Sequence, residues 1–322
     1  MKNPGRILIA LVLVIALLMG TALAEAEKPV KAYFVTIVSG GVAWGAAEKG
    51  FMDACADLGW DGQFCAPTTA NDKQQVINLI ETAVTNEADV ILACIQDKEM
   101  AEEVLTRAKE QNIVVITTNT KAGEELTNAW IGTDPVGMGK AQAAVVLAEA
   151  EKAGLENVTL AYIQTRLGST TQNQQFEVMS EEIKKVYPDA VLIQDECNSN
   201  AQTAADKVAA YRMAYPELNV VVSMDGYGAP GIANYIEGEK LQDELIAIGV
   251  DDSPEILEFV KNNVLRCKIA QNFYAIGYNG CELAKTVLDG GTIDYNNDSG
   301  TITIYPEDCE AHLEVLKERG LA

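Results

Sequence analysis

The chain has 322 residues, a net charge of −23 and 48% hydrophobic residues. A chain of this length can form two ordinary domains, each with its own core. The strongly acidic balance argues against phosphate-bearing partners, because nucleic acids and anionic membranes attract Lys and Arg. We therefore expect no nucleic acid among its partners.

The first 24 residues are typical of a secretory signal. Lys2 and Arg6 precede an apolar run over residues 7–18, and Ala22 and Ala24 provide the small residues of a signal-peptidase site. The run is short for a membrane span, so an uncleaved membrane anchor is the weaker alternative. We expect cleavage near Ala24 and a mature protein that works in the periplasm.

Seven cysteines lie at irregular spacings, and no C-x-x-C pair is present. An odd number without a regular pattern indicates neither a disulfide framework nor a zinc site. Cys55 and Cys65 are the pair that could meet between a helix and the next strand. Whether they form a disulfide stays open at this point.

From residue 31 onward, short β-branched runs alternate with helical patterns. In the first half the patterns predict strands at 31–37, 62–65, 88–95, 112–118 and 128–132, with helices at 44–59, 72–87 and 98–111 between them. Apolar strands separated by helices are typical of a parallel sheet that is buried on both faces.

The same alternation starts again with a helix near 135–152. Strands are predicted at 158–164, 190–194, 219–224, 244–250, 265–271 and 301–305, and helices near 171–187, 201–214, 228–238, 275–288 and at the end of the chain. The segment 296–300 is predicted as a turn. No low-complexity linker separates the halves, so we expect an α/β protein with two doubly wound parallel-sheet lobes that share a hinge.

Polar side chains follow the predicted strands at the carboxyl ends, where ligands bind in open α/β sheets. Amides and carboxylates can each engage two neighbouring hydroxyl groups, and an aromatic ring can cover the apolar face of a sugar. Taken singly, each of these residues could be a turn or cap residue. As a set that converges on one edge, they predict a binding cleft; they are Trp44, Thr118–Thr120, Gln175, Asp225, Asp251–Asp252 and Gln271–Phe273.

The segment GYGAPG at 226–231 is a competing motif, because it fits the dinucleotide fingerprint G-x-G-x-x-G between a strand and a helix. A periplasmic oxidoreductase is therefore the alternative function. Three features weigh against it. The motif lies in the middle of a repeating chain, Pro230 stiffens the turn, and export sends the protein where nicotinamide cofactors are scarce.

Other catalytic arrangements find little support. The only histidine, His312, lies in the final helix and is expected to be far from the strand ends, which leaves no Ser-His or metal-His site. Asp251 and Asp252 are adjacent, so their side chains should point in different directions. They are therefore not expected to act together as an acid–base pair. The turn at 294–300 lacks the spaced ligands of a calcium loop. We expect no enzyme activity, no cofactor and no metal.

The motifs NIVVITTNT, IGTDPVGMGK, VVVSMDG, IAIGVDDSPE and KIAQNFYAIGYNG resemble, in this order, the periplasmic sugar-binding proteins of ABC importers. This type includes the ribose-, galactose- and autoinducer-2-binding proteins, and the likeness runs from Ala32 to about Leu288. The resemblance implies the type I periplasmic binding protein fold, with three hinge crossings and one ligand between the lobes. It divides the chain into residues 1–24 (signal), 25–133 plus 272–300 (first lobe) and 134–271 plus 301–322 (second lobe).

The resemblance also implies roles for individual residues. The ring that stacks on the sugar falls on Trp44, and the polar contacts fall on Asn119, Gln175, Asp225, Asp251 and Gln271. Thr120 and Gln175 stand where ribose binders carry Arg, and Ala43 stands where a second ring is expected. A cleft short of Arg favours a neutral ligand, with Arg166 as the one nearby cation that would change this.

The implied function is a receptor that binds a small neutral sugar or polyol and hands it to an ABC permease and its ATPase. A sensor component that presents the ligand to a chemoreceptor or kinase is a further alternative. We expect the protein to be a monomer.

Overall fold

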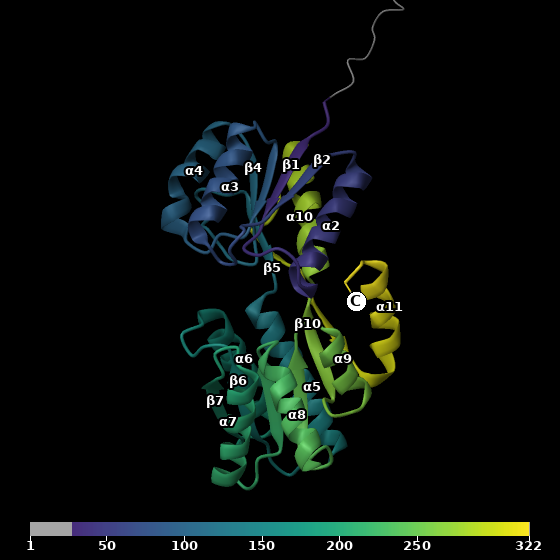
Figure 1. Ribbon diagram of the computed structural model, residues 1–322. Coiled ribbons are helices and arrows are strands. Elements are labelled where there is room, and N and C mark those ends of the chain that lie inside the picture. Colours follow the sequence, from purple (N-terminus) through teal and green to yellow (C-terminus); the bar gives the residue numbers. More distant parts are fainter. Residues whose placement is uncertain (1–27, 322) are drawn as a thin grey trace, which may run out of the picture.

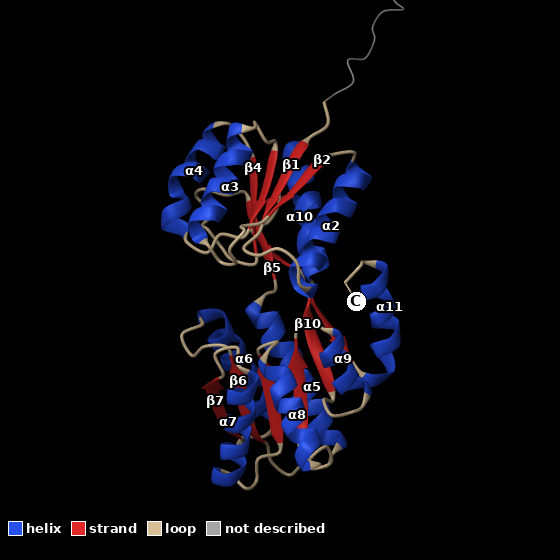
Figure 2. Ribbon diagram, in the orientation of Figure 1, coloured by secondary structure: helices blue, strands red, loops and turns tan. Residues whose placement is uncertain are grey.

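The computed structural model describes residues 28–321. The predicted signal and its cleavage site lie outside these residues. Figure 1 shows two lobes joined by a narrow waist, with the carboxyl-terminal end of the chain beside the waist. Each lobe has one six-stranded sheet with helices on both faces (Figure 2). The predicted pair of α/β lobes is therefore confirmed.

The first lobe contains a fully parallel sheet. Its strands, in spatial order, are β11 (Asn296–Asp298), β5 (Ala129–Gly132), β4 (Val114–Thr118), β3 (Val90–Ala93), β1 (Lys31–Val35) and β2 (Asp61–Cys65). One face packs against α2 (Val42–Leu58) and α10 (Phe273–Leu288), and the other against α3 (Lys73–Thr85) and α4 (Lys98–Glu110).

The second lobe repeats this design with one difference, an antiparallel edge strand. Its strands, in spatial order, are β12 (Thr301–Ile304), β10 (Cys267–Gln271), β9 (Ile246–Val250), β8 (Val220–Met224), β6 (Thr159–Gln164) and β7 (Val191–Glu196), and β12 runs antiparallel to β10. Helices α5 (Pro135–Lys152) and α6 (Thr170–Val186) cover one face. The other face carries α7 (Ala201–Ala214), α8 (Gly228–Glu239), α9 (Pro254–Lys261) and α11 (Cys309–Glu318), with the 3₁₀ turn η1 (Pro306–Asp308) before α11.

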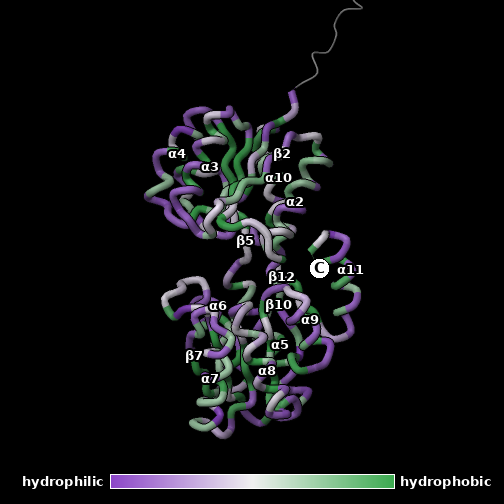
Figure 3. Tube along the Cα trace, viewed as in Figure 1, coloured by the Kyte–Doolittle hydropathy of each residue, from purple (hydrophilic) through white to green (hydrophobic). Residues whose placement is uncertain are grey.

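The apolar runs become buried strands, as the pattern predicts. All residues of β8 and β9 are buried, and Figure 3 shows hydrophobic strands enclosed by helices whose outer faces are hydrophilic. A parallel strand that is covered on both faces is apolar along most of its length. Within residues 28–321, no helix has the length and apolar character needed to cross a membrane.

Two elements differ from the prediction. Residues 296–298, predicted as a turn, form the edge strand β11, which pairs in parallel with β5. Its sequence is polar because a three-residue edge strand buries little of its surface. Helix α9 was not predicted, although Ser253 caps it by accepting a hydrogen bond from the Ile256 N–H and Pro254 begins it.

The chain passes between the lobes three times, and hydrogen bonds hold these crossings side by side. The crossings run from β5 to α5, from β10 to α10 and from β11 to β12. The Ser299 N–H donates to the Gly132 carbonyl at 2.8 Å, and the Asn272 N–H donates to the Gly300 carbonyl at 3.2 Å. The Asp298 carboxylate accepts from the Asp134 and Gly300 N–H groups, both at 2.9 Å. The third crossing thus joins the other two.

The cysteines are unpaired in the part of the chain that the structure describes, where all seven thiols are free. Cys55 and Cys65 do not form a disulfide. The Cys55 thiol interacts instead with that of Cys281 on α10, and this contact lowers the pKa of Cys55.

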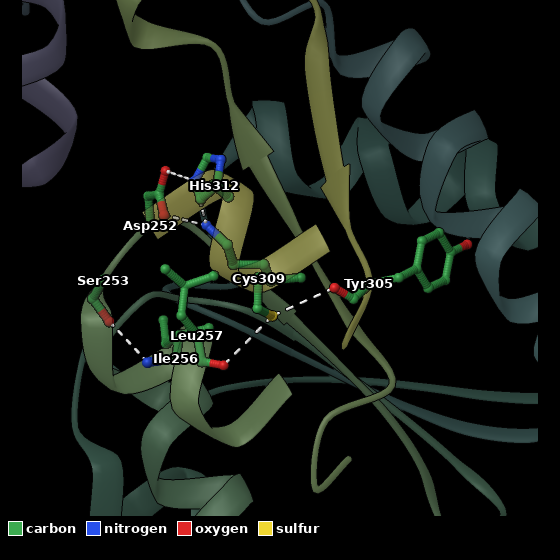
Figure 4. A network of polar contacts seen from close by, with 8 residues as sticks. Asp252, Ser253, Ile256, Leu257, Tyr305, Cys309 and His312 are labelled. Atoms are coloured by element: carbon green, nitrogen blue, oxygen red, sulfur yellow. Dashed lines mark hydrogen bonds and ion pairs between the residues drawn. The ribbon is translucent and has the colours of Figure 1, made fainter. Parts of the chain in front are cut away.

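A buried group of charged side chains joins β9, β10 and α11 (Figure 4). Lys268, with a fully buried side chain, forms an ion pair with Asp252, and His312 Nε2 lies 2.8 Å from the second Asp252 oxygen. Burial by itself raises the pKa of Asp252, but His312 and Lys268 outweigh it and hold the pKa below its usual range. The prediction that His312 lies far from the strand ends is therefore wrong, because α11 folds back onto the end of β9.

We expect this ion pair to be required for stability. Asp252→Asn should leave Lys268 buried without a counter-charge and lower the free energy of unfolding by about 3–5 kcal/mol, measured by urea denaturation. The matched control is Lys261→Ala, which removes the exposed pair between Lys261 and Glu310 and should cost less than about 1 kcal/mol. Equal effects of the two variants would contradict a structural role for the buried pair.

Candidate ligand-binding site

A small pocket lies between the lobes beside the second crossing. Its walls come from the start of α2 in the first lobe and from the ends of β9 and β10 in the second; they are Val42, Ala43, Ala46, Asp251, Asp252, Gln271 and Phe273. The volume of about 20 Å³ is close to that of one water position. Two predicted site residues, Asp251 and Gln271, therefore share a pocket with first-lobe residues.

Asn119 and Asp251 occupy equivalent places in the two lobes. Each directly follows a parallel strand, β4 or β9, and each has a left-handed backbone, with φ of 60° and 65° respectively. Asn and Asp adopt this conformation more readily than most residues other than glycine. Strain of this kind persists where the surroundings impose it and is concentrated at functional sites.

The Asp251 carboxylate is held by close neighbours on two sides. Gln271 Nε2 donates a hydrogen bond of 3.3 Å to Asp251 Oδ1. A methyl group added at Gly226 would lie 2.8 Å from Asp251 Oδ2, so the carboxylate lies directly against this glycine. Burial, together with the charge of Asp225, raises the pKa of Asp251. Because Lys268 is paired with Asp252, no cation in the described residues forms an ion pair with Asp251.

Asp225 is buried, and its carboxylate is fully engaged by the protein. Oδ1 accepts hydrogen bonds from the Tyr227 and Gly228 N–H groups at 2.9 and 2.8 Å. Oδ2 accepts from the hydroxyls of Thr165 and Ser199 at 2.8 and 2.7 Å. Asp225 therefore holds the turn before α8 and ties the loops after β6 and β7 together, and each of its oxygens already accepts two hydrogen bonds.

The hydrogen bonds of Asp225 also argue against a dinucleotide at the GYGAPG segment. A bound pyrophosphate would need the free N–H groups at the start of α8, and the Tyr227 and Gly228 groups are used by Asp225. Gly231 serves packing, since a methyl group there would lie 2.0 Å from the Ala201 carbonyl oxygen of α7. The packing of the protein itself thus accounts for the glycines of this segment, without a bound dinucleotide.

Helix α6 contributes amides of two kinds. Gln172 and Asn173 are engaged within the lobe: Gln172 Nε2 donates to the Met224 carbonyl at 2.6 Å, and Asn173 Oδ1 accepts from Gln164 at 3.0 Å. Gln175 is 5% exposed, and its Oε1 has no partner among the described residues. A buried amide oxygen of this kind needs a hydrogen-bond donor from elsewhere.

Trp44 lies in the first turn of α2, and its ring packs into the core of the first lobe. The ring centroids of Trp44 and Phe273 lie 5.2 Å apart, and those of Trp44 and Phe34 lie 6.4 Å apart, both edge-on. The residue is 8% exposed. In this arrangement the indole is part of the first-lobe core and contacts Phe273, which lines the interlobe pocket.

Three residues around the candidate site were not among the predicted site residues. Gly226, Thr165 and Ser199 shape the surroundings of Asp251 and Asp225, and residues of these types are common in any loop. Thr118 is buried with an unpartnered hydroxyl at the end of β4. Thr120, where ribose binders carry Arg, donates to the Ile95 carbonyl at 2.7 Å and so connects two first-lobe loops. Arg166 is exposed.

Comparison with known proteins agrees with this architecture. Among solved structures, a glucose-galactose binding protein from Geobacillus stearothermophilus has a TM-score of 0.73 at 21% identity, covering 88% of this chain and 99% of its own. The arabinose binding protein of the same organism has a TM-score of 0.78 at 17% identity, with coverages of 88% and 99%. A solute binding protein from Actinobacillus succinogenes 130z with bound D-allose has a TM-score of 0.75 at 17% identity, with coverages of 88% and 100%.

The search of curated protein sequences gave no match. The sequence profile described as "Periplasmic binding protein domain" matches residues 32–292, most of the described chain. The resemblance noted from the sequence motifs is thereby confirmed: the chain belongs to the periplasmic binding protein domain family.

Proposed function

We propose that this protein is an extracytoplasmic solute receptor without enzyme activity. It binds a small neutral sugar or polyol between its lobes and delivers it to the permease and ATPase of an ABC importer. The observation that carries the proposal is Asp251, a partly buried carboxylate at the interlobe pocket that is hydrogen-bonded to Gln271 and forms no ion pair among the described residues. The sugar receptors with the same fold support the ligand class.

The chemistry of these groups favours hydroxyl groups as their partners. A carboxylate accepts hydrogen bonds from two neighbouring hydroxyls, and an amide can both donate and accept. Asp251 and Gln271 offer these groups from the second lobe and Asn119 from the first, while Gln175 supplies an unpartnered amide oxygen. A ligand that carries a carboxylate or phosphate would meet acids here without a free buried cation, which favours a neutral molecule.

Asp225 and Trp44 have indirect roles in this proposal. Asp225 fixes Gly226, against which the Asp251 carboxylate lies, through its hydrogen bonds to the next two N–H groups. Phe273 lines the pocket next to the second crossing, and the Trp44 ring packs edge-on against Phe273. When the lobes approach, these rings become the floor beneath the apolar face of a sugar ring.

Binding proceeds by closure of two rigid lobes, residues 25–133 plus 272–300 and residues 134–271 plus 301–322. The movement is absorbed at the crossings, where a few backbone angles can change without disturbing either core. Thr133 and Ser299 lie there with buried hydroxyls that have no partner among the described residues. A ligand that contacts both lobes binds the closed form better and thereby shifts the population towards it.

The first test is a thermal-shift screen with D-arabinose, D-allose, D-galactose, D-glucose and D-fucose, together with NADH. A sugar at 100 times its dissociation constant should add about 2.7 kcal/mol to the free energy of unfolding. Calorimetry with the best sugar should then show that Asp251→Ala weakens binding about 10- to 150-fold, since a hydrogen bond to a charged group contributes about 1.5–3 kcal/mol.

The matched control is Asp243→Ala. Asp243 is an exposed acid that precedes the start of β9, whereas Asp251 follows its end. This variant should bind like the wild type. Unchanged affinity of Asp251→Ala would remove Asp251 from the site. A saturable shift with NADH, and none with any sugar, would favour the oxidoreductase alternative.

Tryptophan emission should report binding through Trp44. Trp44→Phe is preferred to alanine because the indole fills part of the core. Addition of the best sugar should change the emission of the wild type, of Trp60→Phe and of Trp130→Phe, and leave that of Trp44→Phe unchanged. A response that survives in Trp44→Phe would show that this ring is not near the bound ligand.

Closure should be visible by small-angle scattering. We expect the radius of gyration to fall when the best sugar is added at saturation, because ligand contacts from both lobes favour the compact form. An unchanged scattering curve, with binding confirmed by calorimetry, would contradict the closure mechanism and leave the binding function intact.

A further inference from the structure

The final segment of the chain, residues 309–321, is firmly attached to the second lobe. We call it the C-terminal strap. Its first residue, Cys309, and Leu316 are buried in the core beneath α9. Figure 4 shows the Cys309 thiol directed at the Leu257 and Tyr305 carbonyls, at 3.7 and 3.4 Å, and His312 against Asp252.

The end of the strap has a defined backbone geometry. The Leu321 N–H bonds to the Leu316 carbonyl at 2.8 Å and the Gly320 N–H to the Lys317 carbonyl at 2.9 Å, while Gly320 has a φ of 71°. These two bonds and the left-handed glycine constitute a Schellman motif. Because the motif fixes the direction of the chain after α11, the position of Leu321 is set by the helix that precedes it.

This fixed end contacts the first lobe. The Arg319 guanidinium lies 4.0 Å from the centroid of the Tyr274 ring on α10, and the Tyr274 hydroxyl donates to Asp53 of α2 at 3.0 Å. Leu321 packs against the cores of both lobes, and a methyl group added at Gly45 of α2 would lie 2.8 Å from its Cδ2 atom. An open cavity of about 510 Å³ beside these contacts separates the strap from the rest of α2.

The strap bridges the lobes at a place apart from the three crossings. Elsewhere within residues 28–321, no hydrogen bond or ion pair joins the lobes away from the crossings. In Figure 1 the end of α11 lies next to the lower end of α2, beside the waist. Further opening of the lobes would have to pull Arg319 and Leu321 off the first lobe, because α11 is fixed to the second.

We propose that the C-terminal strap limits how far the lobes open in the absence of ligand. The cation–π contact of Arg319 and the apolar contact of Leu321 together hold the lobes at the separation seen here. A restricted opening keeps the binding-competent arrangement more populated, which raises the apparent affinity for a ligand. Asp252, which anchors the strap through His312, is the neighbour of Asp251, so the strap and the interlobe pocket share one strand end.

The test uses the ligand-free protein and requires no known ligand. Small-angle scattering should give a larger radius of gyration and a larger maximum dimension for the double variant Arg319→Ala/Leu321→Ala than for the wild type. Hydrogen exchange at the first turns of α2 should also become faster, because Leu321 no longer covers Gly45. Both side chains lie at the end of the chain, so the two lobes should fold as before, with an unchanged circular dichroism spectrum.

The control is Lys317→Ala, because Lys317 is an exposed residue of the same helix whose ion pair is with Glu314 of α11. It should leave the scattering and the exchange rates unchanged. His312→Gln should also behave like the wild type, since the amide can still donate to Asp252, whereas His312→Ala should resemble the double variant. A double variant with the wild-type radius, or with a smaller one, would overturn the proposal.

Discussion

The hydrogen bonds between the three crossings are the constraint on which the rest of this structure depends. Asp298 accepts from the backbone on both sides of the waist, and the adjoining Ser299 and Gly300 bond to the first and second crossings. Because the crossings are held together, the carboxyl ends of two independent sheets face the same small space. Without these hydrogen bonds the three crossings would be joined to one another only through the lobes.

Within this frame the two lobes offer their polar groups in the same way. Asn119 and Asp251 each leave a buried strand through a left-handed residue, which turns the chain sharply and places a side chain at the sheet edge. Such a turn has an energetic cost, of order 1 kcal/mol or more for a residue other than glycine. Seven other non-glycine residues within residues 28–321 also have a left-handed backbone, so the geometry alone does not mark a site. At Asn119 and Asp251 it places a polar residue at a strand end in each lobe.

Much of the fold was readable from the sequence, since apolar strands of a parallel sheet and amphipathic helices have distinct periods. The failures have local causes. The strand β11 is polar because it is short and at an edge, and α9 was not predicted although Ser253 and Pro254 gave a start signal. His312 was placed far from the strand ends because a sequence gives no measure of how a last helix folds back. For the candidate site, the sequence predicted a set of strand ends, and the prediction of ligand contacts there still awaits its test. The sequence could not distinguish Asp251, which has free acceptor capacity, from Asp225, whose two oxygens each accept two hydrogen bonds within the protein.

The charged residues near the cleft differ from those expected of ribose-type receptors. Ribose-type receptors are expected to carry Arg at the positions of Thr120 and Gln175. Here Lys268, the one buried cation within residues 28–321, forms an ion pair with Asp252 and lies 3.3 Å from His312 Nε2 of α11. The positive charge of Lys268 is thus paired with Asp252, next to the C-terminal helix, and forms no ion pair with Asp251. Asp251 has Gln271 as its one side-chain hydrogen-bond partner among the described residues, and its partial burial and the charge of Asp225 raise its pKa. A carboxylate in such a position is stabilised by hydrogen-bond donors that add no negative charge. Neutral hydroxyl groups meet that requirement, whereas an acidic ligand would worsen the imbalance.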